Sequence, residues 1–140
     1  MRKRIQRAKV EDTNIWVEGT YFPPTNTLIA HTITPDENEG DFYEYFTVTP
    51  KTVGDYTGVM DKHNTRVFEG DIVRIDEDVK AMFKIHDGPI VYGRGGFYIN
   101  NFDTLNSLCA VASFNGVLRG EVIGNIHDNP ELLEDSICGN

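Results

Sequence analysis

The stretch Gly54-Asp-Tyr-Thr-Gly-Val-Met-Asp61, with Val67-Phe-Glu-Gly-Asp-Ile-Val73 after it, decides the fold that we expect for this chain. Its apolar segments flank a polar turn that contains Asn64, a residue that tolerates the left-handed backbone region. Gly70 and Asp71 then form a corner, where glycine supplies backbone freedom and aspartate accepts hydrogen bonds from nearby N–H groups. The stretch predicts a hairpin followed directly by another strand.

Short strand patterns separated by turns recur along the whole chain of 140 residues. β-Branched and aromatic residues favour strands, and proline and glycine end them. We expect strands over 14–22, 27–33, 42–49, 56–60, 66–69, 72–75, 90–92, 97–99, 110–114 and 120–126. The pattern therefore predicts a mainly β fold, closed into a small barrel because closure removes exposed sheet edges.

Three segments differ from this pattern. Residues 79–85 form a strand, or residues 80–84 form one helical turn, and residues 101–107 form either a loop or a short helix. Asn129-Pro130 offers a cap and a first-turn proline, so it predicts a short C-terminal helical turn.

Composition is that of one domain over 1–140, with a loose tail at 134–140. Hydrophobic residues make up 39% of the chain, including eight Phe and six Tyr, so a core can form without disulfides. No signal peptide or membrane span is evident, so we expect a cytoplasmic protein with no membrane contact. Cys109 and Cys138 are then expected to be reduced.

The charge is unevenly distributed. The net charge of −9 disfavours sequence-independent binding to nucleic acid, which depends on cations that meet phosphates. Residues 1–13, in contrast, form a basic N-terminal arm. Its five cations are Arg2, Lys3, Arg4, Arg7 and Lys9. This arm is a solvated chain end, or it reaches nucleic acid, or it pairs with an acidic face of a neighbouring subunit.

Catalytic, cofactor and metal sites are not expected. The four histidines (His31, His63, His86 and His127) lack the spacing of a metal site, and no Lys-Ser/Thr follows the glycine-rich segment 93–96. An enzyme such as a nuclease would need a set of acids and a base that converge beside a cleft. Its candidates are Asp61, Glu69, Asp71 and His127, of which Asp61 and the Gly-Asp corner fit turn formation better.

Several phrases, in order, resemble the YopX family of bacteriophage and prophage proteins. They are Trp16-Val-Glu-Gly19, Val48-Thr-Pro-Lys-Thr-Val-Gly54, the opening stretch above, Ile123-Gly-Asn-Ile126 and Asn129-Pro-Glu-Leu-Leu133. The resemblance implies an SH3-like barrel with additional β-hairpins or an arm, phage or prophage origin, and self-association. It supplies no catalytic residues, because no activity is established for the family. The turn His63-Asn64-Thr65 departs from the Asn-Gly type that is common among relatives.

Aromatic residues are the remaining candidates for a binding surface. SH3-like barrels use exposed aromatic residues to bind peptides or to stack on bases, and strand alternation points only half of such residues outward. The candidate interaction residues are Arg2, Lys3, Arg4, Arg7, Tyr43, Tyr45, Tyr92 and Tyr98.

Three functions follow from these observations. The favoured one is a non-enzymatic accessory module that forms a homo-oligomer and could bind a phage or host protein. The alternative is a nucleic-acid-binding protein that uses the basic arm and the aromatic residues, and the third is the enzyme described above.

Overall fold

A computed structural model describes residues 5–32, 40–83, 85–93, 95–100, 105–107 and 116–133. The chain divides into two compact units, Met1–Tyr56 and Thr57–Asn140. Each unit has a hydrophobic core of its own. The expectation of one domain over 1–140 stays a prediction.

The first unit is an antiparallel sheet with the strand order β4-β3-β2-β1-β5. The strands are β1 (Gln6–Lys9), β2 (Trp16–Phe22), β3 (Thr27–Thr32), β4 (Phe42–Thr47) and the beginning of β5 (Gly54–Met60). Two short 3-10 helices that start at proline, η1 (Pro23–Thr25) and η2 (Pro50–Thr52), connect them. Asn26 ends η1 with a left-handed backbone (φ 51°), which turns the chain back along β2.

Alternation along the strands builds the core of this unit, because successive side chains of a strand point to opposite faces. Ala8 of β1, Leu28 of β3 and Val48 are fully buried, and Val17, Tyr21, Phe46 and Val53 pack against them. Arg7 and Lys9, on either side of Ala8, lie on the opposite face. The segment Gln6–Lys9 is thus a strand between β2 and β5, and not part of the arm that we expected over 1–13.

The second unit contains a sheet with the strand order β10-β9-β8-β7-β11. Its strands are β7 (Asp71–Ile75), β8 (Gly88–Gly93), β9 (Gly96–Asn100), β10 (Leu105–Ser107) and β11 (Gly120–Asn125), and β6 (Arg66–Phe68) neighbours β5. Helix α1 (Glu77–Phe83) connects β7 to β8. The core residues are Val67, Val73, Ile75, Val79, Ile85, Ile90, Ile99 and Leu118.

The fold class is confirmed as mainly β, but barrel closure is not confirmed. Both sheets are open in the part of the chain that the structure describes, with β4 and β10 as edge strands. The strand reading of 79–85 is wrong and the helical reading is right, because Glu77 and Asp78 supply the acids that favour a helix start. Residues 105–107 are a strand and not a loop or helix. Residues 131–133 are helical, as the C-terminal signal predicts, whereas the strand expected at 110–114 lies outside the described residues.

Candidate interaction surface

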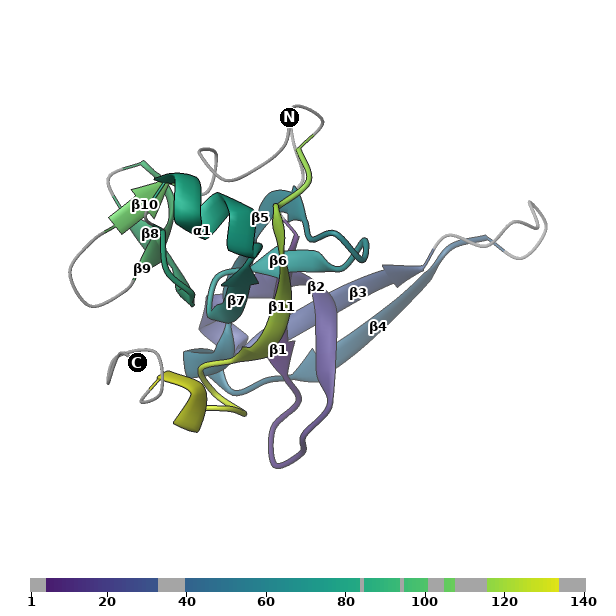
Figure 1. Ribbon diagram of the computed structural model, residues 1–140. Coiled ribbons are helices and arrows are strands. Elements are labelled where there is room, and N and C mark those ends of the chain that lie inside the picture. Colours follow the sequence, from purple (N-terminus) through teal and green to yellow (C-terminus); the bar gives the residue numbers. More distant parts are fainter. Residues whose placement is uncertain are drawn as a thin grey trace. The chain divides into compact units, whose positions relative to one another are not determined.

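Strands β3 and β4 run side by side as a two-stranded ribbon at the edge of the first unit's sheet (Figure 1). Their register pairs Thr32 with Phe42 at one end and Thr27 with Thr47 at the other. Strand β4 is the last strand of this sheet in the described part of the chain, so β3 is its one neighbouring strand there, and at its end the Thr47 carbonyl also accepts from the N–H of Glu11 at 2.9 Å.

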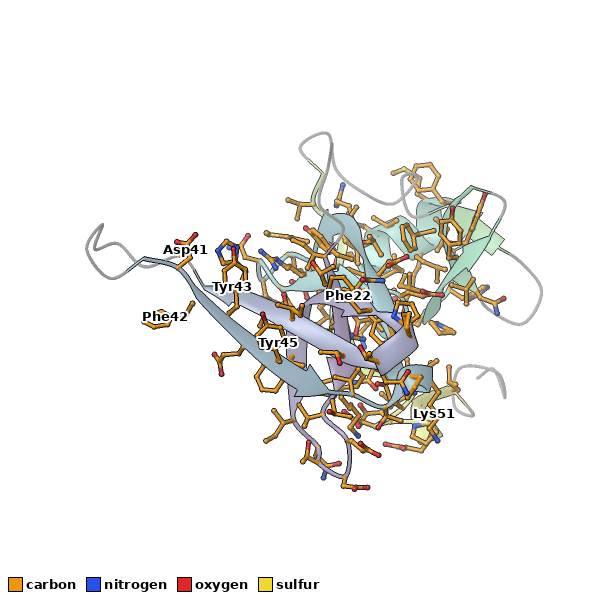
Figure 2. The ribbon with its side chains drawn as sticks, turned by 180° about the vertical axis from the view of Figure 1, so that it is seen from behind. Phe22, Asp41, Phe42, Tyr43, Tyr45 and Lys51 are labelled. Atoms are coloured by element: carbon orange, nitrogen blue, oxygen red, sulfur yellow. The ribbon has the colours of Figure 1, made fainter. Side chains whose placement is uncertain are left out.

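The first four residues of β4 are all exposed, which is unusual for a strand in a sheet that covers a core. The exposed fractions are 53% for Phe42, 55% for Tyr43 and 68% for Tyr45, and Glu44 between them is also exposed. Figure 2 shows the three rings along the ribbon. Because neighbouring side chains point to opposite faces, both faces of the ribbon are open here. We call the set Phe42, Tyr43 and Tyr45 the aromatic hairpin.

The extent of the core explains this exposure. Phe46 and its register partner Leu28 are the last residues of the ribbon that belong to the core. Phe42 lies on the same face as Phe46 but four residues earlier, about 13 Å along the strand at roughly 3.3 Å per residue. That distance carries Phe42 past the core cluster of the first unit, so about half of its surface stays exposed.

The opposite face of the ribbon carries Tyr43 and Tyr45. Phe22 of β2, which is 45% exposed, shares this face because the register aligns Phe22 with Thr27 and Thr27 with Thr47 (Figure 2). His31 stacks on Tyr43, with ring centroids 4.5 Å apart and planes inclined by 5°. The contact fixes the orientation of Tyr43, so this part of the surface is formed before any partner binds.

The aromatic hairpin has an acidic setting. Residues 35–50 contain five acids (Asp36, Glu37, Glu39, Asp41 and Glu44) and no Lys or Arg. In the structure, Asp41 accepts from His31, with Nε2 and Oδ2 3.1 Å apart. Asp41 and Glu44, the two of these acids that the structure describes, adjoin the rings in the sequence and make this part of the surface negatively charged.

Arg7, a candidate from the basic arm, belongs to the sheet surface. Its guanidinium carbon lies 4.7 Å from the centre of the Trp16 ring, and the Lys9 ammonium lies 5.8 Å from the same ring. These are cation–π distances, and Arg7 is half-buried. The other three candidates of the arm, Arg2, Lys3 and Arg4, lie outside the described residues.

The two candidates in the second unit do not share one surface. Tyr92 of β8 is 56% exposed and meets the edge of Phe97 at a centroid distance of 5.1 Å. Tyr98 of β9 is half-buried and pairs with Val91, the position before Tyr92, so it points to the other face of the sheet.

Asp61, one of the acids that an enzyme would need, has a structural role. Asp61 is 2% exposed, and its Oδ1 accepts from the N–H groups of His63 and Thr65, each at 2.9 Å. Its Oδ2 accepts from the N–H of Val122 at 3.0 Å, which ties the turn to β11. Burial alone would raise the pKa of Asp61, but these three N–H donors outweigh burial and hold the pKa below its usual value.

Asp71 has a similar role at the Gly-Asp corner. It is buried, its Oδ2 accepts from the N–H of Phe68 at 2.7 Å, and Gly70 beside it has a φ of +93°. Glu69 and His127 each make interactions as well. Within the described ranges, no three His, Cys, Asp or Glu side chains come close enough to hold a metal ion.

The sequence analysis named Tyr43 and Tyr45, which are exposed, but it did not name Phe22, Phe42 and His31. The available signal was the run Phe42-Tyr-Glu-Tyr-Phe46, which has aromatic residues at four of five positions. Alternation places such a run on both faces of a strand, so one face of aromatic residues had to be core or a second exposed surface.

The fold and this surface define a mainly β protein with an exposed acidic and aromatic ribbon. The family model described as "YopX protein" matches residues 6–134, and the chain belongs to this family. A solved structure with a similar fold is that of protein EF1440 from Enterococcus faecalis. It is 22% identical in sequence, with a TM-score of 0.54 over 94% of this chain and 98% of that one. No curated protein sequence matches this chain.

In the described residues, no helix has the length and apolar character that crossing a membrane requires.

Proposed function

We propose that this protein is a non-enzymatic interaction module that self-associates through the aromatic hairpin. The observation that supports this most strongly is the exposure of both faces of β4 over Phe42, Tyr43 and Tyr45. Large exposed apolar rings gathered on one element are typical of protein contact sites.

The free energy that the aromatic hairpin contributes to association can be estimated. Complete burial of a large apolar side chain contributes roughly 1.5–3 kcal/mol, so three half-exposed rings supply about 2–5 kcal/mol. Association costs roughly 4–15 kcal/mol in lost freedom, so the rings need additional contacts from the partner. We therefore expect self-association in the micromolar range, with polar or charged groups that complete the interface.

The wider setting belongs to the same proposal. Membership of the YopX family supports a phage or prophage accessory protein that acts in the cytoplasm of a bacterial cell, where a phage or host protein is a further partner. The proposal also includes an SH3-like arrangement of the strands. The proposal assigns no catalytic role, because Asp61 and Asp71 already serve as acceptors for local N–H groups.

Light scattering on a size-exclusion column tests this proposal. At high micromolar concentration the unaltered protein should exceed the monomer mass of 15.8 kDa. The double substitution Phe42→Ser with Tyr45→Ser should restore the monomer mass, because it removes two rings that no core contact holds. Tyr92→Ser is the matched control, since Tyr92 is exposed to a similar degree in the other unit. A monomeric unaltered protein, or a double variant as large as the unaltered one, would contradict the proposal.

A second candidate function is nucleic-acid binding, which the cluster of Arg7 and Lys9 around Trp16 favours. The acidic hairpin opposes it, because Tyr43 and Tyr45 are flanked by carboxylates that repel phosphate. We expect no retention on single- or double-stranded DNA at low salt. Retention that disappears in the triple variant Arg2→Gln, Lys3→Gln, Arg4→Gln would replace the proposed function with this one.

A further inference from the structure

The chain contains two segments of opposite charge. Its first nine residues carry five cations and no acid, and residues 36–44 carry five acids and no Lys or Arg. The acidic segment leads into the aromatic hairpin and includes Asp41 and Glu44. Two copies of one chain therefore each offer a basic segment and an acidic surface.

We propose that the aromatic hairpin of one copy binds the basic N-terminal segment Arg2-Lys3-Arg4 of a second copy. The inference rests on the proposed function, since it names the partner of the same surface. Arg7 and Lys9 are not part of this contact, because both lie against Trp16 within their own sheet.

Charge favours this head-to-tail contact over a symmetric one. If two hairpins met each other, Asp41 and Glu44 of one copy would approach the same carboxylates of the other, and like charges in close contact are destabilising. Arginine fits the surface better, because its guanidinium pairs with carboxylates and also stacks on aromatic faces. The charged pairs are the additional contacts that the three rings require.

The free edge of β4 offers a place for the segment. In the described part of the chain, β4 is the last strand of its sheet, and its outer side carries no strand before Thr47, whose carbonyl accepts from the N–H of Glu11 at 2.9 Å. An extended segment that adds to such an edge presents alternate side chains to the two faces of the sheet. This matches the hairpin, which exposes Phe42 and Glu44 on one face and Tyr43 and Tyr45 on the other.

A contact between two different surfaces has a consequence for assembly. A growing assembly keeps an unused basic segment at one end and an unused hairpin at the other. Copies therefore add until a ring closes or a filament grows. The mass should thus rise past the dimer with concentration. It should fall as salt is added, because salt screens the charge pairs.

Mixing two variants tests the inference. The segment variant carries Arg2→Gln, Lys3→Gln and Arg4→Gln, and the hairpin variant carries Asp41→Lys and Glu44→Lys with its rings intact. Each variant alone should be monomeric by light scattering, because each lacks one of the two surfaces. An equimolar mixture should form a one-to-one complex of twice the monomer mass, since one intact contact remains. Glu77→Lys with Glu131→Lys makes the same charge change at exposed acids of the other unit and should leave assembly intact.

The outcomes separate the two proposals. If the segment variant assembles as the unaltered protein does, while Phe42→Ser with Tyr45→Ser abolishes assembly, this inference is wrong and the proposed function stands. If both variants are monomeric and their mixture gives no complex, the inference is wrong as well. If the unaltered protein is monomeric at high micromolar concentration, both proposals fail.

Discussion

Asp61→Asn is expected to lower the free energy of unfolding of the second unit by about 3 kcal/mol. Asparagine has one oxygen where aspartate has two, so its NH₂ group must face at least one of the N–H donors of His63, Thr65 and Val122. A buried donor left without an acceptor costs roughly 1–3 kcal/mol, and hydrogen bonds to a charged acceptor contribute roughly 1.5–3 kcal/mol. Urea unfolding followed by circular dichroism measures the loss.

Asp76→Asn is the matched control for this substitution. Asp76 pairs with Lys62 at 3.0 Å in a partly exposed ion pair, which contributes about 0–1 kcal/mol. A loss at Asp61 no larger than the loss at Asp76 would show that the three backbone hydrogen bonds do not hold the turn.

The same carboxylate gives a pH dependence with a defined sign. Its pKa is lower in the folded protein than in the unfolded chain, where a carboxyl titrates near 4. The stabilisation from Asp61 is therefore complete above the unfolded pKa and is lost as the pH falls through the folded pKa. Stability of the unaltered protein should fall more steeply below about pH 4 than that of Asp61→Asn. Parallel pH profiles of the two proteins would refute this.

Gly19→Ala is expected to destabilise the first unit by about 3 kcal/mol, at the upper end of the usual cost of overpacking. A Cβ atom on Gly19 would lie 2.1 Å from the backbone oxygen of Ile29, and neither strand can move without breaking the pairing of β2 with β3. The smaller entropy of an unfolded alanine offsets only about 0.4–1 kcal/mol of this.

Gly93→Ala serves as the control for this clash, because a Cβ atom there meets nothing within 4 Å and the substitution should be nearly neutral. Thermal unfolding of the two variants, with hydrogen exchange of β2 and β3, measures the difference. Equal melting temperatures for both variants would contradict the close approach of the strands.

Turn chemistry was predictable from the sequence because it is local. Asn64 has the expected left-handed backbone (φ 64°), and Asp61 accepts from N–H groups two and four residues away, as a turn-forming aspartate does. The third donor, Val122, is 61 residues away, and no local pattern contains such a contact. The sequence could thus identify the turn but not its attachment to β11.

Strand β1 and helix α1 show why other elements were misread. In β1 the cations Arg7 and Lys9 lie on either side of the buried Ala8. Because these residues are charged, the segment was read as a basic arm and its strand alternation was not recognised. In α1 the apolar residues Met82 and Phe83 are exposed, and their presence made the segment resemble a strand. Both cases depend on which face the rest of the chain covers, and this is set by tertiary packing.

The aromatic hairpin could be predicted only in part, because the exposure of its residues also depends on tertiary packing. The sequence named Tyr43 and Tyr45 as candidates, and alternation implied that only half of the aromatic residues point outward while the rest fill the core. That holds for Phe46 and fails for Phe42, because the core ends between them. The length of a core relative to a strand is a property of the folded unit and has no signature in the strand itself.

The claim that the aromatic hairpin is where copies meet is tested most directly by ¹⁹F NMR of protein labelled with 3-fluorotyrosine. Substitution of each tyrosine in turn by phenylalanine assigns the six signals. As the concentration rises from low to high micromolar, the signals of Tyr43 and Tyr45 should shift or broaden while that of Tyr92 stays unchanged. Signals of Tyr43 and Tyr45 that do not change, in samples whose mass does increase, would place the contact elsewhere.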